Sequence, residues 1–283
     1  TRIRQKSADL RHVVQTNLER ARKKYDLQSK QLQGTEDREK YKVYGELINT
    51  YGYNLDPEAK SLTCLNYYTN EDITIPLDSQ KTPQENAQKY FAKYNKQKRT
   101  FEALSELIQE TADEISYLES VSNSLDIALS EADLGQIKEE LTASGYVRRK
   151  FTKKKVKLTN KPMHYISSDG YDIYVGKNNI QNDELTFSFA NGGDWWFHAK
   201  GAPGSHVIVR TNGDELPDRT FEEAGRLAAY YSKNRGSDKV EIDYIEKKHV
   251  KKPNGAKPGF VVYYTNYSLV IDSDISNIKV VQD

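Results

Sequence analysis

The sequence has 283 residues, of which 36% are hydrophobic and 29% are charged, and its formal net charge is +1. The apolar fraction lies below the ~45–50% of an average globular domain, so one compact core cannot extend through the whole chain. Either part of the chain is disordered, or part of it is an elongated helical element with a thin apolar seam. No apolar run approaches the ~18 residues of a membrane helix, and the single cysteine, Cys64, rules out an internal disulfide and a thiolate zinc cluster. Composition thus excludes a membrane protein, a disulfide scaffold and a wholly disordered tail, and we expect about two domains and no membrane insertion.

Charge is segregated along the chain. Residues 1–33 carry a net charge of +6, residues 34–100 of zero, residues 101–140 of −10 and residues 141–283 of +5. Segments of opposite charge on either side of a neutral insert are expected to pair with each other. The sequence begins with Thr1, without methionine or a signal segment, which suggests a piece of a longer protein.

The basic and acidic segments are predicted to be the two arms of an antiparallel coiled-coil hairpin. The acidic arm has apolar or small residues at alternating spacings of three and four, which is the coiled-coil pattern: Phe101, Leu104, Ile108, Thr111, Ile115, Leu118, Ser122, Leu125, Leu129 and Ala132. The basic arm has a looser apolar seam and no glycine or proline before Gly34. The alternative is two ordinary helices packed in a bundle.

A small α/β insert is expected between the arms. Residues 38–50 have the pattern of a helix, residues 61–68 and 73–77 of two strands joined by a turn, and Thr82-Pro83-Gln84-Glu85 of the start of the next helix. The insert has no obvious place for catalysis, so we interpret it as a probe at the tip of a stalk that touches a large partner.

The last part of the chain is predicted to be a compact α+β domain. Strand patterns alternate with turns at residues 171–175, 195–198, 207–209, 239–244 and 259–264, and one helix is expected from Phe221 to Ser232, capped by Thr220. The predicted fold class is therefore α+β. Its parts are coiled-coil arm 1 (1–33), the middle insert (34–84), coiled-coil arm 2 (85–142) and an RNA-binding-type domain (143–283).

No motif for catalysis, a metal or a cofactor is recognised, and we expect that this chain is not an enzyme and needs no cofactor. The five histidines form no HxxxH or HExxH spacing, and no cysteine or carboxylate lies between His198 and His206. Ser205 and His206 are neighbours in a strand, so their side chains point to opposite faces. The glycine-rich residues 201–205 lack the Walker spacing, and they either form a tight turn alone or also contact an anion beside Lys200.

Three features instead favour RNA binding. Residues 141–168 contain eight lysines and arginines and no acid, and a second basic cluster follows at residues 247–257. Four amide side chains lie close together in residues 178–182, where they suit base edges and sugar hydroxyls. The alternative is that Asn178 and Asn179 form a turn and that Asn182 or Asp183 caps a short helix. In residues 195–198 one face of the strand is expected in the core, and the other, if exposed, would stack on bases.

The candidate nucleic-acid-binding residues come from these three features and from the positions beside them at 177, 200, 205 and 206: Arg148, Arg149, Lys153, Lys154, Lys155, Lys177, Asn178, Asn179, Asn182, Trp196, His198, Lys200, Ser205, His206, Lys247, Lys248, Lys251 and Lys252.

Three segments resemble the NFACT-R domain, which closes the proteins of the NFACT family. They are GKNNIQND at 176–183, DWWFHAKGAPGSHVI at 194–208 and VKKPNGAKPG at 250–259. PQENAQKYF at 83–91, followed by Tyr94-Asn95-Lys96, is similar to the entry of the second coiled-coil arm of the family. The resemblance extends over essentially the whole chain.

The resemblance implies a cytoplasmic, ribosome-associated quality-control factor that binds the obstructed large ribosomal subunit and tRNA. In the complete proteins it implies support for untemplated alanine tailing of stalled nascent chains. The family's N-terminal part is missing from this sequence, so the chain is expected to bind but not to support tailing by itself. Streptococcal relatives are also described as fibronectin-binding surface adhesins, so fibronectin and the cell surface form the alternative.

Overall fold

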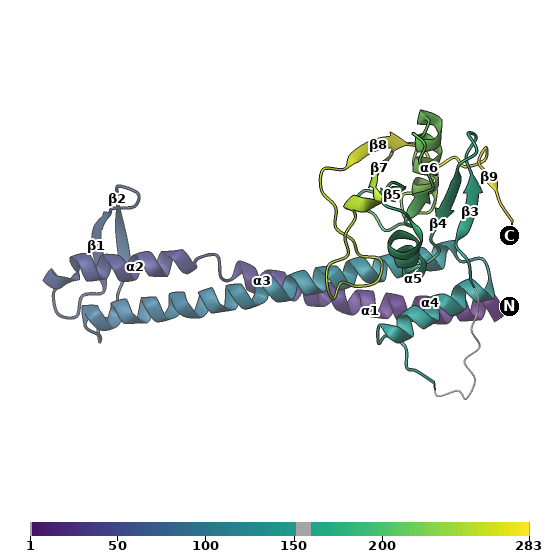
Figure 1. The fold of residues 1–283 in the computed structure, drawn as a ribbon. Helices are drawn as coiled ribbons and strands as arrows, with labels where there is room; N and C mark the ends of the chain where they lie inside the picture. The colour runs from purple at the N-terminus through teal and green to yellow at the C-terminus, as the bar shows by residue number, and fades with distance from the viewer. Residues whose placement is uncertain (1, 151–159, 283) are drawn as a thin grey trace. The chain divides into compact units, whose positions relative to one another are not determined.

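The computed structural model describes residues 2–150 and 160–282, which divide between two compact units (Figure 1). We call residues 22–112 the insert unit, and residues 1–21 together with 113–283 the sheet unit. Helix α1 (Arg2–Gln33) and helix α3 (Pro83–Ile127) contribute to both units. A long helical N-terminal region is thus followed by a sheet-rich region, as expected for an α+β chain. No helix among the described residues is long and apolar enough to cross a membrane.

The insert unit contains the predicted helix and hairpin. Helix α2 (Arg38–Tyr51) continues into the short helix η1 (Gly52–Asn54), and strands β1 (Ser61–Asn66) and β2 (Glu71–Pro76) pair in antiparallel register. The predicted first strand is two residues too long, because the Asn66 side chain accepts a hydrogen bond from the Tyr68 backbone and turns the chain there. Helix α3 begins at Pro83 as predicted, and the Glu85 backbone N–H donates to the Thr82 hydroxyl.

Within the sheet unit, the start of α1 packs against the end of α3. Leu10, Val14 and Leu18 are buried with Tyr117, Leu118, Val121 and Leu125 in one cluster. Arg11 pairs with Asp126 at 2.8 Å and Lys6 with Glu131 at 2.5 Å. Positions that ascend along α1 therefore meet positions that descend along the later segment, and the pairs join a basic residue to an acidic one. A continuous coiled coil over the full length of both arms stays a prediction.

The second arm is not one continuous helix. Helix α3 ends at Ile127, and a new helix α4 (Glu131–Ala143) begins after Ser130. Ser130 and Asp133 form a reciprocal capping box, in which the Asp133 N–H donates to the Ser130 hydroxyl and the Ser130 N–H donates to the Asp133 carboxylate. The predicted seam is therefore wrong at its end, where Leu129 is 85% exposed. Leu134, Ile137 and Leu141 of α4 return to the core cluster of α1 and α3.

The sheet is antiparallel and has seven strands in the order β8-β7-β5-β6-β4-β3-β9. Its strands are β3 (Met163–Ile166), β4 (Asp172–Val175), β5 (Trp195–Ala199), β6 (Val207–Val209), β7 (Val240–Glu246), β8 (Tyr267–Ile271) and β9 (Lys279–Val280). The predicted strand at 259–264 is wrong. Only Val262 forms a ladder contact there, an isolated bridge with Lys251, and the edge strand β8 lies further along the chain.

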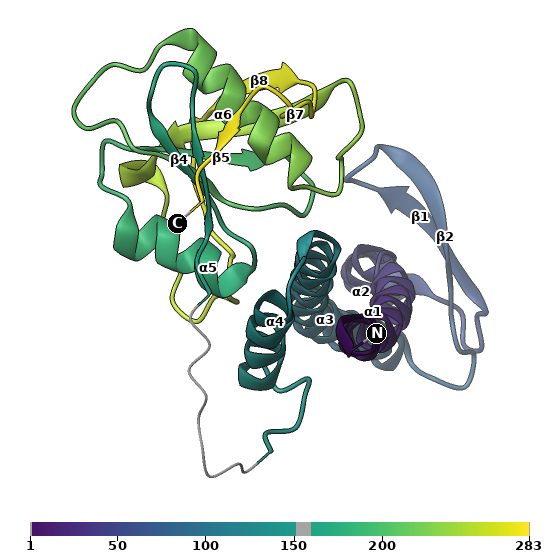
Figure 2. The same cartoon turned by 90° about the vertical axis from the view of Figure 1, so that its right-hand side faces the viewer.

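Both faces of the sheet are covered (Figure 2). Helix α6 (Asp218–Tyr230) packs on the face that carries Phe197, Val207 and Ile242. Helix α5 (Asn179–Glu184) and the π-helical turn η2 (Leu185–Phe189) belong to the other face, where Leu185 is buried with Trp196 and Ile208.

The expected Thr220 cap of α6 is wrong, because the helix already begins at Asp218, directly after Pro217. Thr220 is fully buried inside the first turn instead. Its hydroxyl is within hydrogen-bond distance, 3.0 Å, of the Ser167 hydroxyl and of the Asp169 carboxylate. The threonine therefore joins the start of α6 to the turn between β3 and β4.

Candidate nucleic-acid interface

The predicted interface residues fall into exposed and buried groups. Arg148 and Arg149 are exposed after α4, whereas Lys153, Lys154 and Lys155 lie outside the described residues. The structure brings the remaining candidates to the face of the sheet that α5 covers and to the segment that follows β7.

The amide cluster is buried, so the expectation that Asn178, Asn179 and Asn182 line an exposed surface is wrong. Asn178 is the N-cap of α5, and its side-chain oxygen accepts from the Gln181 backbone N–H at 2.9 Å. The Asn182 side-chain oxygen accepts from the His206 backbone N–H at 3.1 Å. The alternative of a short capped helix is right in kind but wrong in position, because Asn178 is the cap and the expected caps Asn182 and Asp183 lie inside α5. Buried amides need hydrogen-bond partners, and here they find them within the protein.

A buried glutamate joins the amides to the helical arm. Glu140 of α4 is 1% exposed, and its carboxylate accepts from the Asn179 backbone N–H at 2.9 Å and from the Tyr117 hydroxyl at 2.7 Å. The Asn179 amide also donates to the Ser120 hydroxyl at 2.8 Å. Burial raises the pKa of Glu140, and these donors oppose that shift. Glu140 was not predicted from the sequence, because nothing in an acidic helix distinguishes one carboxylate from its neighbours.

Two of the predicted lysines are held inside the domain. The Lys177 ammonium pairs with Asp133 at 3.2 Å. The Lys252 ammonium pairs with Asp183 at 3.1 Å and donates to the backbone carbonyls of Lys257 and Phe260. Lys252 therefore fastens the loop that it begins to α5, and its charge is already compensated. Contact of these two lysines with phosphate stays a prediction, and it would require these ion pairs to open.

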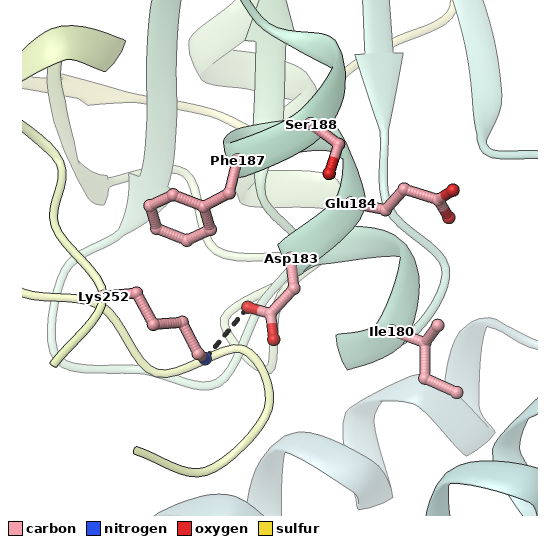
Figure 3. A pocket seen from close by; sticks show the side chains of 6 residues that line it. All are labelled: Ile180, Asp183, Glu184, Phe187, Ser188 and Lys252. Carbon is pink, nitrogen blue, oxygen red and sulfur yellow. Dashed lines mark hydrogen bonds and ion pairs between the residues drawn. The ribbon is translucent and has the colours of Figure 1, made fainter. Parts of the chain in front are cut away.

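An open hollow lies beside Lys252 (Figure 3). It is lined by apolar, acidic and hydroxyl side chains of α5 and η2 together with that lysine: Ile180, Asp183, Glu184, Phe187, Ser188 and Lys252. Two carboxylates at this wall repel a phosphate, so the hollow is not suited to the backbone of RNA.

The aromatic strand offers no exposed stacking platform. Trp196 and Phe197 are buried on opposite faces of the sheet, and Trp195 packs edge-on against Phe221. His198 is half-buried and stacked on Trp196, and burial lowers its pKa. Both faces of this strand thus serve the core.

His206 and Ser205 are also interior. The His206 ring nitrogens lie 2.8 Å from the Thr186 hydroxyl and 3.1 Å from the Gly259 carbonyl, and burial lowers the His206 pKa to about 3. Ser205 is 2% exposed, and its backbone N–H donates to the Tyr231 carbonyl. The direct RNA contacts expected of Trp196, Ser205 and His206 conflict with this burial.

Residues 201–205 form a tight turn, as one of the two alternatives stated. Gly201 has a φ of +63°, which favours glycine, and a side chain at Gly204 would approach the Ser232 Cβ to 3.1 Å. Lys200 is exposed and pairs with Glu241 at 3.1 Å. An anion contact at this turn stays a prediction.

Three of the predicted cations that reach solvent lie close together after β7. The short helix η3 (Lys247–His249) is fastened to the turn before β5, because the Lys247 N–H donates to the Asp194 carbonyl and the Lys248 N–H to the Gly192 carbonyl. We call Lys247, Lys248 and Lys251 the basic edge; the first is half-buried and the other two are exposed. Lys248 pairs with the nearby Glu246 at 3.2 Å, and neither Lys247 nor Lys251 has an ion pair within the described part of the chain. Lysines on a rigid backbone segment can contact successive phosphates.

A second basic surface, which was not predicted from the sequence, lies in the insert unit. Rings of α2 and α3 stack there, with Tyr41 and Tyr90 nearly parallel at 5.9 Å, and the Lys93 ammonium lies 4.2 Å from the Tyr41 ring centre. We call this surface the lysine–tyrosine face: Lys40, Lys42, Lys89, Lys93 and Lys96 with Tyr41, Tyr44, Tyr90 and Tyr94. All five lysines are exposed, and none pairs with a carboxylate among the described residues. The available signal was the acid-free run 86–101, which holds five cations but was hidden in the zero net charge of residues 34–100.

Comparisons with known proteins match two family models to consecutive parts of the chain. The family described as NFACT N-terminal and middle domains matches residues 1–160, and the NFACT protein RNA binding domain matches residues 161–264.

Among curated proteins, the chain is 43% identical over 279 residues to the Rqc2 homolog RqcH of Streptococcus suis, a match that covers 98% of this chain and 50% of that protein. It is 39% identical over 282 residues to the Rqc2 homolog RqcH of Bacillus subtilis, covering 98% of this chain and 49% of that protein. The chain thus spans about half the length of these relatives. An 81-residue stretch, 28% of this chain, is 37% identical to 7% of the human ribosome quality control complex subunit NEMF.

Among solved structures, the chain is similar to the C-terminal part of the fibronectin/fibrinogen-binding protein from Streptococcus suis. The TM-score is 0.77 at 38% sequence identity, and the match covers 99% of this chain and all of that one.

Proposed function

This chain belongs to the NFACT family, and from that premise we propose that it is the RNA-binding part of a ribosome quality-control factor. The observation that carries the proposal is the basic edge. Its three lysines are held on a fastened segment of the domain that matches the NFACT RNA-binding domain, and only Lys248 has a carboxylate partner among the described residues. Phosphate contacts of this kind supply affinity and orientation rather than sequence specificity.

The proposed partners are tRNA and the obstructed large ribosomal subunit, in the cytoplasm. The basic edge would contact tRNA or ribosomal RNA, and the lysine–tyrosine face of the insert unit would contact the large subunit, where its rings could stack on unpaired bases. In the complete protein these contacts would support untemplated alanine tailing of a stalled nascent chain. The support for this step is the similarity to proteins named RqcH and NEMF.

We propose binding rather than catalysis for this chain. His198 and His206 lie with their ring centres 5.7 Å apart, but His206 is buried with hydrogen-bond partners at both nitrogens, and His198 is half-buried and stacked on Trp196. A general base needs access to the proton that it removes. If purified protein hydrolysed an ester, a nucleotide or an aminoacyl-tRNA, and lost that activity on His206→Ala, the proposal would be overturned.

Charge reversal at the basic edge tests RNA binding. Titrations of labelled tRNA at several salt concentrations would compare the native chain with the triple variant Lys247→Glu, Lys248→Glu, Lys251→Glu. We expect weaker binding and a log–log salt slope that is flatter by about 2–3, since each lost phosphate contact removes ~0.7–0.9.

The matched control reverses three exposed cations elsewhere in the same domain, Arg219→Glu, Lys239→Glu and Lys279→Glu. Both triple variants change the net charge by the same amount. If both weakened tRNA binding equally, the effect would be due to the overall charge and not to the basic edge. Salt-independent binding, or no binding at low salt, would contradict the proposal.

Fibronectin binding is the second candidate function. It is favoured by the similarity over 99% of this chain to the C-terminal part of a protein titled fibronectin/fibrinogen-binding, which would act at the cell surface. A competition titration separates the two. If ribosome binding is the tighter interaction, large subunits carrying peptidyl-tRNA should displace the chain from fibronectin. If fibronectin binding is the tighter interaction, they should not displace it.

A further inference from the structure

We propose that Glu140 and Asn179 are positioning residues for RNA binding: they set the position of Lys251 in the basic edge from inside the domain, without contacting RNA. The inference rests on the proposed RNA binding and concerns how the basic edge is held. A continuous set of contacts leads from the helical arm through α5 to the lysines, and each contact involves a buried or half-buried group.

The first contact lies between the arm and α5. The Glu140 carboxylate accepts the backbone N–H of Asn179 at 2.9 Å and approaches the Asn179 side-chain amide at 3.3 Å. Glu140 is 1% exposed, and Tyr117 and Asn179 supply its donors. A buried carboxylate with such donors is costly to displace, because a separated partner would stay unsatisfied.

The second contact lies between α5 and the loop 252–260. A side chain at Gly259 would put its Cβ 2.1 Å from the Asn179 side-chain oxygen, so the loop backbone lies directly against that amide. The Gly259 N–H donates to the Asp183 carboxylate at 3.0 Å, and the same oxygen of Asp183 accepts the Lys252 ammonium at 3.1 Å.

The third contact joins the loop to the basic edge. Lys251 and Val262 exchange backbone hydrogen bonds of 2.9 Å in both directions and close the neck of the loop. Neighbouring residues in extended backbone point to opposite sides. With Lys252 held inward by Asp183 and two carbonyls, Lys251 is turned outward beside η3. The buried contacts thereby decide which lysine faces solvent.

Two glycine variants test the contact between Asn179 and the loop 252–260. Gly259→Ala places a methyl group against Asn179, whereas Gly255→Ala lies in the same loop with a positive φ of 71° and nothing within 4 Å. Both carry the conformational cost of a left-handed residue, but only the first disturbs Asn179. We expect Gly259→Ala to weaken tRNA binding at least fivefold more than Gly255→Ala does, and to increase amide hydrogen exchange in residues 251–260.

A second set of variants tests the contact between Glu140 of α4 and Asn179 of α5. Asn179→Asp places two carboxylates together and should accelerate exchange in residues 251–260, while Glu140→Gln combined with Asn179→Asp restores a donor–acceptor pair and should rescue both exchange and tRNA affinity. Glu139→Gln, at the exposed neighbouring position, removes the same charge as Glu140→Gln and is the control. Near-UV circular dichroism identifies variants that keep the native packing.

The outcomes separate the inference from the proposed function. Unchanged exchange in residues 251–260 for folded Gly259→Ala and Asn179→Asp would overturn the inference, even if reversal of the basic edge still abolished RNA binding. If the native chain did not bind tRNA at all, the proposed function would fall, and with it the positioning role. If Asn179→Asp does not fold, Gly259→Ala against Gly255→Ala decides.

Discussion

The side-chain amide of Asn123 on α3 donates to the backbone carbonyl of Tyr231, 3.1 Å away at the end of α6. Both residues are buried, and they are separated by more than a hundred positions in the sequence. Asp126, one turn further along α3, accepts both Lys233 at 2.5 Å and Arg11 at 2.8 Å. Helix α3 is thus joined both to α1 and to the sheet-covering helix within one unit.

Removal of the Asn123 amide should destabilise the sheet unit. Asn123→Ala removes one of two donors to the buried Tyr231 carbonyl, which keeps the Ser205 N–H, and we expect a loss of about 0.5–1.5 kcal/mol in the free energy of unfolding. Urea denaturation followed by tryptophan fluorescence would measure it, because both tryptophans lie in the sheet. Asn277→Ala, at an exposed position, is the control, and equal midpoints for the two variants would contradict the prediction.

The end of the second arm can be tested with two leucines. Leu125 is 2% exposed in the core of α1, α3 and α4, whereas Leu129 is 85% exposed between the helices. Leu125→Ala should cost about 2–5 kcal/mol of stability. Leu129→Ala should stay within about 0.5 kcal/mol. A continuous seam would instead make the two losses similar, so comparable costs would favour the uninterrupted coiled coil.

The sheet unit should lose stability as the pH falls below about 6.5, and His206 is one cause. Its folded pKa, about 3, lies below the ordinary histidine value, so between these values the unfolded chain binds a proton that the folded chain excludes. The stability from its neutral, buried ring is complete above pH ~6.5 and is lost as the pH falls toward 3, by about 1.4 kcal/mol per pH unit.

Unfolding titrations at pH 7.5 and pH 5.5 would measure this slope. His206→Gln removes the titrating group. The loss of stability between pH 7.5 and pH 5.5 should then be smaller by about 1.4 kcal/mol, although the substitution also lowers stability at both pH values. The same substitution at the exposed His12 should leave the slope nearly as it is in the native chain. A native slope in His206→Gln would show that the ring is not the group responsible.

The two basic surfaces are predicted to have different partners. Lys89→Ala, Lys93→Ala and Lys96→Ala together should weaken sedimentation with large ribosomal subunits by about tenfold at 150 mM salt, from three lost phosphate contacts. The affinity for free tRNA should change less than twofold. The exposed Lys30, Lys60 and Lys81 of the same unit form the control triple. If both triple variants weakened binding to the large subunit equally, the lysine–tyrosine face would have no specific role in that binding.

Local features of the sequence were sufficient for much of the fold. Thr82 and Pro83 predicted the start of α3, because a cap and a proline act within one helical turn. The runs of β-branched and aromatic residues in β4, β5 and β6 predicted strands for a similar reason. The family resemblance rested on runs of residues and therefore did not depend on knowing which side chains are exposed.

Burial of the candidate site depended on contacts between distant residues. Asn179 lies 39 positions from Glu140, its buried partner, and no local pattern indicates that pairing. The adjacent Lys251 and Lys252 have the same side chain, yet one is exposed and the other is held by Asp183, 69 positions away. Sequence composition determined that this part of the chain is basic and rich in amides. Only tertiary packing decided which of those groups face solvent, because the desolvation of a polar side chain depends on whichever segments the fold places against it.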